Sequence, residues 1–459
     1  MIERSLGQIA KMLNAVLADP NSSGLMIKGV TTDSRTVEKG NLYIPLIGEK
    51  FDGRIFIKEC QDAGASAFLV DKDFKITSGI KIPHIIVDDT KKALQDLARA
   101  YKDQLDIKTI AITGSNGKTT TKNIMASVLA SKYKVEKTKG NLNNDIGLPK
   151  TILSLNEDTQ IGILEMGTDN FGDISLLTNI ARPDIAIIMN IGDSHLENLK
   201  TKEGIAKAKL EILEGLKEDG IFIYNGDDPT LKKVLPQVKI KQKVISFGQN
   251  EDVDFRVKAE GETRQKTSFS KDGNLYSVPL LGSHQVYNGA CCLLIGEIFG
   301  LSYDEINYGL LNVTSEANRN ALIECHGFDI LDDAYKSNPQ SLHQGLETTK
   351  ILGGYVRKIA VLGDMLELGD NEKELHYQAG KDIDPNDIEY VLCYGRLSKY
   401  ICLGALENFP KNRVKHFDNK DDLIDYLKLL IIKSSLVFVK GSRGMHMEEV
   451  IESIKYLRV

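Results

Sequence analysis

A glycine-rich segment followed by a lysine and threonines is the first part of the sequence with residues suited to chemistry. Residues 109–125 read TIAITGSNGKTTTKNIM. An isoleucine-rich run precedes the glycines and a helix-forming run follows them, which predicts a strand, a tight turn and a helix. The N–H groups of such a turn and of the helix N-terminus form an anion site. Lys118 would face nucleotide phosphates, and the hydroxyl of Thr119 or Thr120 could ligate Mg²⁺.

This loop is shorter than the general phosphate-binding pattern, which has four residues between its first glycine and the Gly-Lys pair. Here two residues separate Gly114 from Gly117 and Lys118. The loop is therefore a damaged phosphate loop, a chance turn, or a variant with its own chemistry. The strand before it and the helix after it favour a working cradle. Its predicted members are Gly114, Ser115, Asn116, Gly117, Lys118, Thr119 and Thr120.

Polar side chains also follow the next two predicted strands. Glu165 follows the apolar run IGIL, and His195 follows the run IAIIMNIG. Ligands bind at the carboxyl ends of parallel strands, so Glu165 could hold Mg²⁺ or be an ordinary solvated carboxylate. His195 could be a ligand or a hydrogen-bonding residue. Lys209 lies in a lysine-rich predicted helix, and the sequence alone does not distinguish it from its neighbours.

Two later clusters are candidates for the remainder of a nucleotide. His284, Gln285 and Asn288 begin a predicted helix, where they could contact a base or cap the helix. In the last third of the chain Asp333 and Asn338 follow a strand, where a ribose or phosphate could lie. Two α/β units that both direct such loops outward predict a nucleotide held between them, with closure excluding water.

The elements that position these residues predict three α/β domains in a row. Residues 1–105 form a small N-terminal α/β domain. Residues 106–313 form the central domain, with a P-loop-type parallel sheet and helices on both faces, because its apolar runs are continuous rather than alternating. Within it, KDGN predicts a hairpin turn. Residues 314–459 form a Rossmann-like, doubly wound domain.

Composition excludes several classes of protein. The 459 residues carry a formal net charge of -6, which argues against a generic nucleic-acid binder. None of the six cysteines forms a CxxC pair, so buried thiols in a reducing compartment are expected. No signal peptide and no run of ~20 apolar residues is present. We expect a cytoplasmic protein without membrane insertion.

Taken together, the motifs resemble those of the Mur ligase family. The short loop TGSNGKTTTK is followed in that family's order by GNLNNDIGLPKT, EMG, GSHQVYN, DDAYKSNPQS, LGDMLELG and KGSRGM. TTDSRTVEKGNLYIPLIGEKFDG near the N-terminus extends the resemblance over essentially the whole chain. The GKTT loop alone also fits folylpolyglutamate synthases. The DDAYKSNP, GDMLELG and KGSRGM motifs are specific to the branch that adds D-alanyl-D-alanine.

The resemblance implies an ATP-dependent amide ligase. ATP would phosphorylate the terminal carboxylate of UDP-N-acetylmuramoyl-tripeptide, and the amine of D-Ala-D-Ala would attack the acyl phosphate. Two Mg²⁺ ions are implied. Whether the third peptide residue is lysine or diaminopimelate stays open. The expected partners are these small substrates, with no nucleic acid, and the chain is expected to act as a monomer.

The resemblance also implies residue roles. Lys118 would bind the ATP phosphates, Thr119 and Glu165 one Mg²⁺, and His195 the second. Lys209 matches a lysine that many relatives carbamylate, and the carbamate could bridge to a metal. Nucleotide contacts are implied for Asn288, Arg319, Asp333 and Asn338. The UDP end would be contacted by Ser34 and Arg35, and the muramoyl-peptide end by Asn143, Asn144 and Asp145.

Two positions depart from the family pattern, Gln285 in place of Asn and Arg54 in place of His, and the stretch TDNFGDI after EMG fits the pattern loosely. None of these departures removes a phosphate or metal group. One rival hypothesis is a ligase of the same mechanism with another substrate, such as a glutamate-adding Mur ligase or folylpolyglutamate synthase. The other is a P-loop NTPase that acts as a switch and makes no covalent product. Phosphate release and amide formation distinguish these hypotheses.

Overall fold

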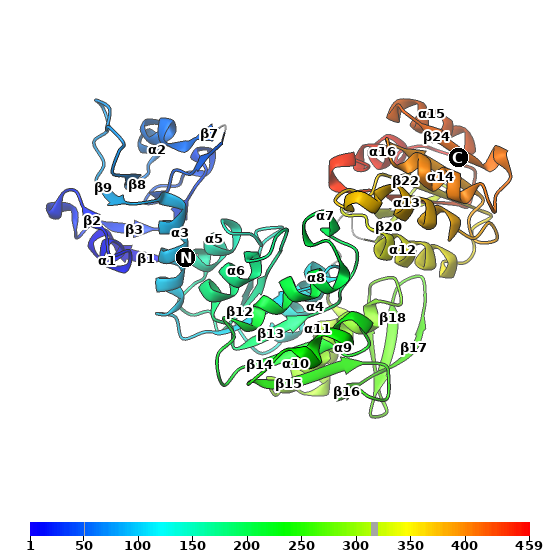
Figure 1. Ribbon diagram of the computed structural model, residues 1–459, viewed down its shortest axis with the longest axis horizontal. Coiled ribbons are helices and arrows are strands. Elements are labelled where there is room, and N and C mark those ends of the chain that lie inside the picture. Colours follow the sequence, from blue (N-terminus) through cyan, green and yellow to red (C-terminus); the bar gives the residue numbers. More distant parts are fainter. Residues whose placement is uncertain (50, 314–319) are drawn as a thin grey trace.

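The computed structural model describes residues 1–49, 51–313 and 320–459. These residues form three α/β units, with the central unit between the other two (Figure 1). The predicted fold class is confirmed, because each unit is built on its own sheet with helices packed against it.

The N-terminal unit is built on a small five-stranded sheet of order β2-β9-β8-β5-β4, with β2 antiparallel and the others parallel. Two short antiparallel pairs, β1 with β3 and β6 with β7, flank it. Its strands are β1 Glu3–Ser5, β2 Val16–Leu17, β3 Met26–Lys28, β4 Val30–Thr31, β5 Leu42–Tyr43, β6 Ile47–Gly48, β7 Phe51–Asp52, β8 Ala67–Asp71 and β9 His84–Val87. Its helices are α1 Leu6–Met12, α2 Ile57–Ala63 and α3 Thr90–Lys102.

The central unit is a seven-stranded parallel sheet of order β11-β12-β10-β13-β14-β15-β16. Its strands are β10 Lys108–Thr113, β11 Val135–Lys137, β12 Ile161–Glu165, β13 Ile185–Ile188, β14 Ile221–Asn225, β15 Lys243–Gly248 and β16 Phe255–Arg256. The helices are α4 Lys118–Leu129, α5 Gly147–Ser154, α6 Asp173–Ala181, α7 Leu196–Leu199, α8 Lys202–Leu210, α9 Pro229–Val234, α10 Gln285–Ile298 and α11 Tyr303–Leu311.

The strands of this sheet are buried on both faces, as their continuous apolar runs predict. In β10, Ile110 and Ile112 pack into the core under α4, α10 and α11. Ala111 points the other way, into the core under α5, α6 and α8. Since β10 is an interior strand between β12 and β13, its carboxyl end places the glycine-rich loop beside the carboxyl ends of both neighbours.

An antiparallel three-stranded sheet follows, made of β17 Lys258–Glu262, β18 Thr267–Lys271 and β19 Asn274–Val278. The predicted KDGN turn is confirmed. Asp272 and Gly273 have φ of 51° and 81°, the left-handed pair that a two-residue hairpin turn requires.

The C-terminal unit has a six-stranded sheet of order β20-β21-β25-β22-β23-β24, parallel except for β20. Its strands are β20 Ala321–Glu324, β21 Asp329–Asp333, β22 Arg357–Gly363, β23 Tyr390–Tyr394, β24 Val414–Phe417 and β25 Ser435–Lys440. Helices α12 Pro339–Ile351, α13 Glu372–Lys381 and α14 Ser398–Ala405 contribute to the core on one face, and α15 Lys420–Leu430 and α16 Glu448–Ile454 to the core on the other. The unit is doubly wound, as predicted.

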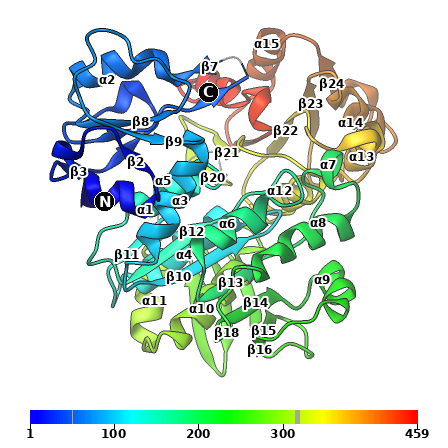
Figure 2. The ribbon, with the colours of Figure 1, turned by 60° about the vertical axis from the view of Figure 1, so that its left-hand side comes forward.

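The N-terminal and central units share one core along α3. This helix packs on α5 and α6 (Figure 2). The hydroxyl of Tyr101 donates to the carbonyl of Leu155 at 2.9 Å, and the N–H of Ile2 donates to the carbonyl of Leu153 at 2.8 Å. The boundaries near residues 105 and 313 stay predictions, and the second one borders the residues outside the described part. Among the described residues, no helix has the length and apolar character that a membrane span requires.

Candidate active site

The glycine-rich loop has the strand–turn–helix form predicted for it. It leaves β10 after Thr113 and enters α4 at Lys118. Gly114 and Gly117 have φ of 153° and 80°, values that side chains disfavour. A Cβ on Gly117 would also lie 3.0 Å from the side-chain oxygen of Asn288. Both glycines are therefore required by the backbone path of this short loop.

The loop is fixed by the segment that follows β13. The N–H of Ser115 donates to the Asn190 carbonyl at 3.0 Å, and the N–H of Asn116 donates to Asn190 Oδ1 at 2.9 Å. Gly192 N–H donates to Ser115 Oγ at 2.8 Å. The N–H groups of Ser115 and Asn116 are therefore already hydrogen-bonded within the protein. The N–H groups that can bind an anion are those at the start of α4, because helix geometry leaves them without a partner in the helix.

Lys118 projects over the loop that it ends. Its Nζ donates to the carbonyl of Gly114 at 2.6 Å. An ammonium that rests on a carbonyl of the loop can be recruited by a phosphate bound at the same helix N-terminus, because the charge-assisted bond is the stronger one.

Glu165 lies next to this loop at the end of β12, in register with Ile112 of β10. It is 2% exposed. It accepts hydrogen bonds from Thr119 Oγ1 at 3.2 Å and Asn143 Nδ2 at 2.9 Å, and it pairs with Lys122 at 3.1 Å. Burial alone would raise the pKa of Glu165, but the ammonium groups of Lys122 and Lys118 and the Asn143 bond outweigh it and hold the pKa below its usual value. The carboxylate is ionised.

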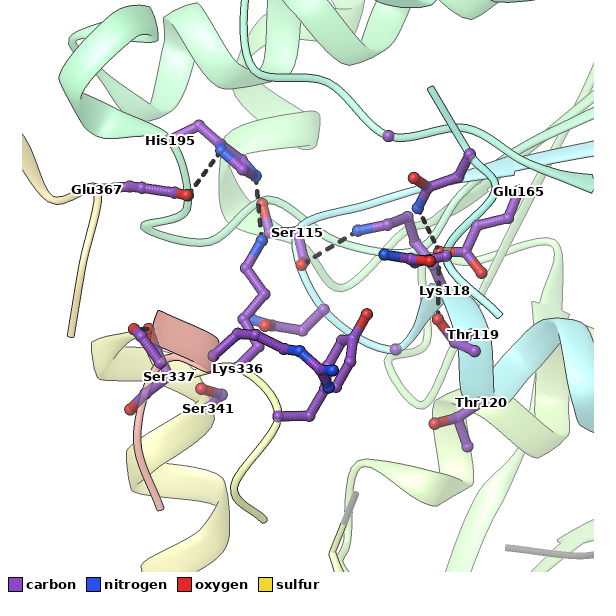
Figure 3. Close-up of a pocket in the computed structure, with 18 of the residues that line it drawn as sticks. Ser115, Lys118, Thr119, Thr120, Glu165, His195, Lys336, Ser337, Ser341 and Glu367 are labelled. Atoms are coloured by element: carbon purple, nitrogen blue, oxygen red, sulfur yellow. Dashed lines mark hydrogen bonds and ion pairs between the residues drawn. The ribbon is translucent and has the colours of Figure 1, made fainter. Parts of the chain in front are cut away.

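His195 joins three segments of the chain. Its Nδ1 lies 3.0 Å from carboxylate oxygens of both Asp169 and Glu367, and its Nε2 lies 3.0 Å from Nζ of Lys336. These bonds lower the pKa of Asp169 and Glu367 below their usual values. The partners assign the proton to Nδ1 and leave Nε2 as an acceptor. Lys336 and Glu367 belong to the C-terminal unit, so His195 holds the two units together (Figure 3).

Lys209 is the residue that sequence alone did not distinguish, and its environment is unusual. It lies on α8 and is 2% exposed, yet the described part of the chain gives its Nζ no hydrogen bond or ion pair. Burial, with the positive charges of Lys118 and Lys336, lowers the pKa of Lys209 far below its ordinary value. Burial therefore favours the neutral amine over the ammonium ion, and the neutral amine is the nucleophilic form.

The residues at the start of α10 face the same cavity and do not cap the helix. Asn288 accepts from Thr121 Oγ1 at 3.1 Å and donates to Gln285 Oε1 at 2.8 Å. Burial, with a smaller effect of Lys440, lowers the pKa of His284 to about 4. The sequence left two roles open for these side chains, contact with a base and capping of the helix. The structure excludes capping, because no side chain of the cluster, which lies wholly within the described residues, makes a cap hydrogen bond to α10.

The C-terminal unit contacts the glycine-rich loop directly. Asn338 Nδ2 donates to Asn116 Oδ1 at 3.0 Å and to Ser194 Oγ at 2.8 Å, and Asn116 Nδ2 donates to Gln340 Oε1 at 2.9 Å. Asn338 also caps α12 and is 1% exposed. Its side chain therefore links the units and is not part of the cavity wall.

A cavity of about 620 Å³ lies between the central and C-terminal units. Most predicted site residues line it, while Gly114, Asn338, Ser34 and Arg35 do not, and Arg319 lies outside the described residues. Ser34 and Arg35 lie in the N-terminal unit, where Arg35 pairs with Asp33 at 2.7 Å. The lining residues among the predictions are Ser115, Asn116, Gly117, Lys118, Thr119, Thr120, Asn143, Asn144, Asp145, Glu165, His195, Lys209, Asn288 and Asp333.

Sequence reasoning missed several cavity residues and their partners. Lys122 lies one helical turn after Lys118, a spacing that would have placed both on one face of α4. Lys336 and Glu367 lie in motifs that were recognised, but no pattern indicated contact with His195. Lys440 pairs with Asp333 while 1% exposed, and its motif gave no sign of that pairing. Within the described ranges, no three His, Cys, Asp or Glu side chains gather into a metal-binding cluster.

Comparison with known proteins gives one consistent result. Residues 26–102, 112–296 and 318–443 match the catalytic, middle and glutamate ligase domains of the Mur ligase family, respectively. The chain is 41% identical to the UDP-N-acetylmuramoyl-tripeptide–D-alanyl-D-alanine ligase of Bacillus subtilis over 99% of both chains.

Solved structures agree with the sequence match. MurF from Acinetobacter baumannii superposes with a TM-score of 0.89 at 27% identity, with 99% of each chain covered. MurF ligase from Thermotoga maritima, in complex with ADP, gives a TM-score of 0.81 at 29% identity, covering 93% of this chain and 97% of that one.

Proposed function

The chain belongs to the Mur ligase family, and on that premise we propose that it joins D-alanyl-D-alanine to UDP-N-acetylmuramoyl-tripeptide at the expense of ATP. This reaction is a step of peptidoglycan precursor synthesis. The observation that carries the proposal is one cavity whose wall contains both the loop and helix N-terminus of the central unit and the strand-end loops of the C-terminal unit. The proposal is supported by the 41% identity, over 99% of both chains, to the UDP-N-acetylmuramoyl-tripeptide–D-alanyl-D-alanine ligase of Bacillus subtilis.

The first half of the reaction is phosphoryl transfer. A terminal carboxylate oxygen of the tripeptide attacks the γ-phosphorus of ATP, the bond to the β-phosphate oxygen breaks, and an acyl phosphate and ADP result. Such a transfer needs alignment and charge neutralisation more than a protein nucleophile. Lys118 and the first N–H groups of α4 supply these at the phosphates.

Amide formation is the second half. The D-Ala-D-Ala amine attacks the acyl carbonyl carbon, a tetrahedral intermediate forms, and phosphate leaves with the oxygen that came from the carboxylate. The amine loses its proton during this step. Contacts of Lys336 with His195, and of Asn338 and Gln340 with the loop, keep the two units together and so exclude water from the acyl phosphate.

The residues around Glu165 fit a Mg²⁺ ion. Thr119 and the ionised Glu165 present adjacent oxygen donors, the type of ligand that this hard cation prefers. We propose that these two residues hold one Mg²⁺, which when bound neutralises charge on the phosphate oxygens. A second ion would use His195 and a carbamate on Lys209. Nε2 of His195 now contacts Nζ of Lys336. His195 could bind the second ion through Nε2 only if the ion replaced Lys336 there.

The remaining assignments follow from position. Asn143, Asn144 and Asp145 line the cavity, and we propose that they face the muramoyl-peptide end. Ser34 and Arg35 lie in the N-terminal unit, for which we propose the UDP end, with the substrate extending from there into the cavity. We also propose that Asn288, Arg319 and Asp333 contact the nucleotide. We propose that the protein is cytoplasmic and acts as a monomer.

Phosphate release tests the proposed function. We expect release from ATP only when UDP-N-acetylmuramoyl-tripeptide and D-Ala-D-Ala are both present, with one new amide per phosphate by mass spectrometry. Lysine-containing and diaminopimelate-containing tripeptides assayed side by side identify the preferred substrate. Release that needs glutamate in place of D-Ala-D-Ala would support the rival ligases. Release with ATP and a partner protein, without an amide, would support a nucleotide switch.

A further inference from the structure

Arg443 occupies a central position in the wall that the C-terminal unit contributes to the cavity. It begins the short 3-10 helix Arg443–Met445 that follows β25. β25 lies between β21 and β22 in the sheet, so its loop emerges between the DDAYKSN loop and the GDMLELG loop. Arg443 and Gly444 line the cavity together with Tyr335 and Leu366 from those two loops.

The backbone just before Arg443 is firmly held. Ser442 is 7% exposed. Its N–H donates to the carbonyl of Asp364 at 3.1 Å, its hydroxyl accepts from the N–H of Leu366 at 2.9 Å, and its carbonyl accepts from the N–H of Met445 at 2.8 Å. The side chain of Arg443 therefore starts from a fixed point, which lowers the entropic cost of using it to bind a ligand.

The Arg443 guanidinium is oriented but not neutralised. Its Cζ lies 5.3 Å from the centre of the Tyr335 ring. A guanidinium over an aromatic ring keeps the N–H groups of its planar edge available for a carboxylate. Arg443 is exposed, and over the described ranges of the chain it has no ion pair or side-chain hydrogen bond.

Other cations of the cavity are already engaged. Lys440 pairs with Asp333 and is 1% exposed. Lys336 contacts His195, and Lys118 rests on the carbonyl of Gly114 in the loop assigned to ATP. Among the described residues that line the cavity, Arg443 is thus the cation whose position and free guanidinium edge suit an additional anionic ligand.

The dipeptide substrate brings such an anion. Its amine must reach the acyl phosphate, while its carboxylate takes no part in the reaction and enters a cavity that already holds acidic groups. An extended dipeptide spans about 7 Å, so its carboxylate needs a counter-charge on the wall away from the phosphates. In Figure 3 Lys336, Ser337 and Ser341 on the C-terminal side face Lys118 and Thr119 across the cavity.

We infer that Arg443 binds the C-terminal carboxylate of D-Ala-D-Ala and selects a dipeptide with a free carboxylate. This inference rests on the proposed function. Bidentate binding of the carboxylate by the guanidinium edge, with Tyr335 behind it, fixes the far end of the dipeptide and so orients its amine.

The test compares D-Ala-D-Ala with D-alanyl-D-alaninamide, which lacks the negative charge. In the wild-type enzyme the amide should have a KM about 10- to 100-fold higher, as expected for loss of a charge-assisted pair. Arg443→Ala should raise the KM for D-Ala-D-Ala by a similar factor and leave the KM for the amide within about twofold. Arg443→Lys should lie between the two enzymes, since it keeps charge but not the planar fork.

For Arg443→Ala, the KM values for ATP and for the UDP-substrate should stay within about twofold of the wild-type values. The control variant Arg413→Ala, which changes an arginine outside the cavity wall, should behave as wild type. An equal loss with both dipeptides, unchanged kinetics, or a raised KM for ATP in Arg443→Ala would overturn the inference. Arg443→Lys gives the same comparison if the alanine variant does not fold. A wild-type protein that ligates no dipeptide would instead refute the proposed function.

Discussion

Replacing Lys118 by alanine is expected to reduce turnover by about 10³-fold or more while leaving binding of UDP-N-acetylmuramoyl-tripeptide largely intact. The charge on the transferring phosphoryl group needs an opposing charge at the start of α4, and interactions of this kind are worth several kcal/mol in a water-poor site. The UDP-substrate has no contact assigned to Lys118. Steady-state phosphate release gives the loss of turnover, and calorimetric titration with the UDP-substrate gives the binding.

The matched control is Lys139→Ala, because Lys139 is exposed and lies outside the cavity wall. It should keep wild-type turnover. Turnover of Lys118→Ala within about tenfold of wild type would show that the loop does not position the transferred phosphate.

A second large effect is expected at Lys209. In its neutral form, which burial favours, the Lys209 amine can react with CO₂, forming a carbamate and releasing a proton, and the carbamate is an oxygen ligand. The carbamate would also offset the nearby charges of Lys118 and Lys336. Lys209→Ala should lose about 10²- to 10³-fold in kcat, and added acetate or formate should restore part of the activity by occupying the vacated volume. Carbon-13 NMR of enzyme equilibrated with labelled bicarbonate should show a carbamate signal that the variant lacks.

Lys207→Ala is the control for this experiment, because Lys207 lies on the same helix α8 but is exposed. It should retain full activity. The thermal unfolding temperature of Lys209→Ala shows whether the variant is still folded, so that a loss of activity can be attributed to the missing carbamate. A fully active Lys209→Ala protein would refute carbamylation as a requirement.

Local features of this protein could be predicted from sequence because their causes are local. The runs TIAIT and IAIIMNIG are continuous, which indicates strands covered on both faces. Gly114 and Gly117 surround a turn that needs their backbone freedom. Glu165 follows its strand at the edge where parallel sheets bind ligands. All three features reappear in the structure at the cavity or beside it.

Contacts between units could not be predicted in this way. The resemblance implies a nucleotide contact for Asn338, and no sequence pattern indicated that its amide caps α12 and bridges to Asn116 and Ser194 of another unit. The contact of Lys336 with His195 joins residues 141 positions apart. Such pairings depend on how whole sheets dock, which residue spacing does not encode. The burial of Lys209 is also a tertiary effect, and only the family resemblance drew attention to that residue.

The central claim, that ATP activates the tripeptide carboxylate as an acyl phosphate before amide formation, is tested most directly with oxygen-18. UDP-N-acetylmuramoyl-tripeptide labelled in both oxygens of its terminal carboxylate is incubated with ATP, Mg²⁺ and D-Ala-D-Ala, and the products are analysed by mass spectrometry. We predict one labelled oxygen in each inorganic phosphate and one in the new amide, with ADP as the other product. Labelled AMP with release of pyrophosphate, or unlabelled phosphate beside the amide, would contradict it.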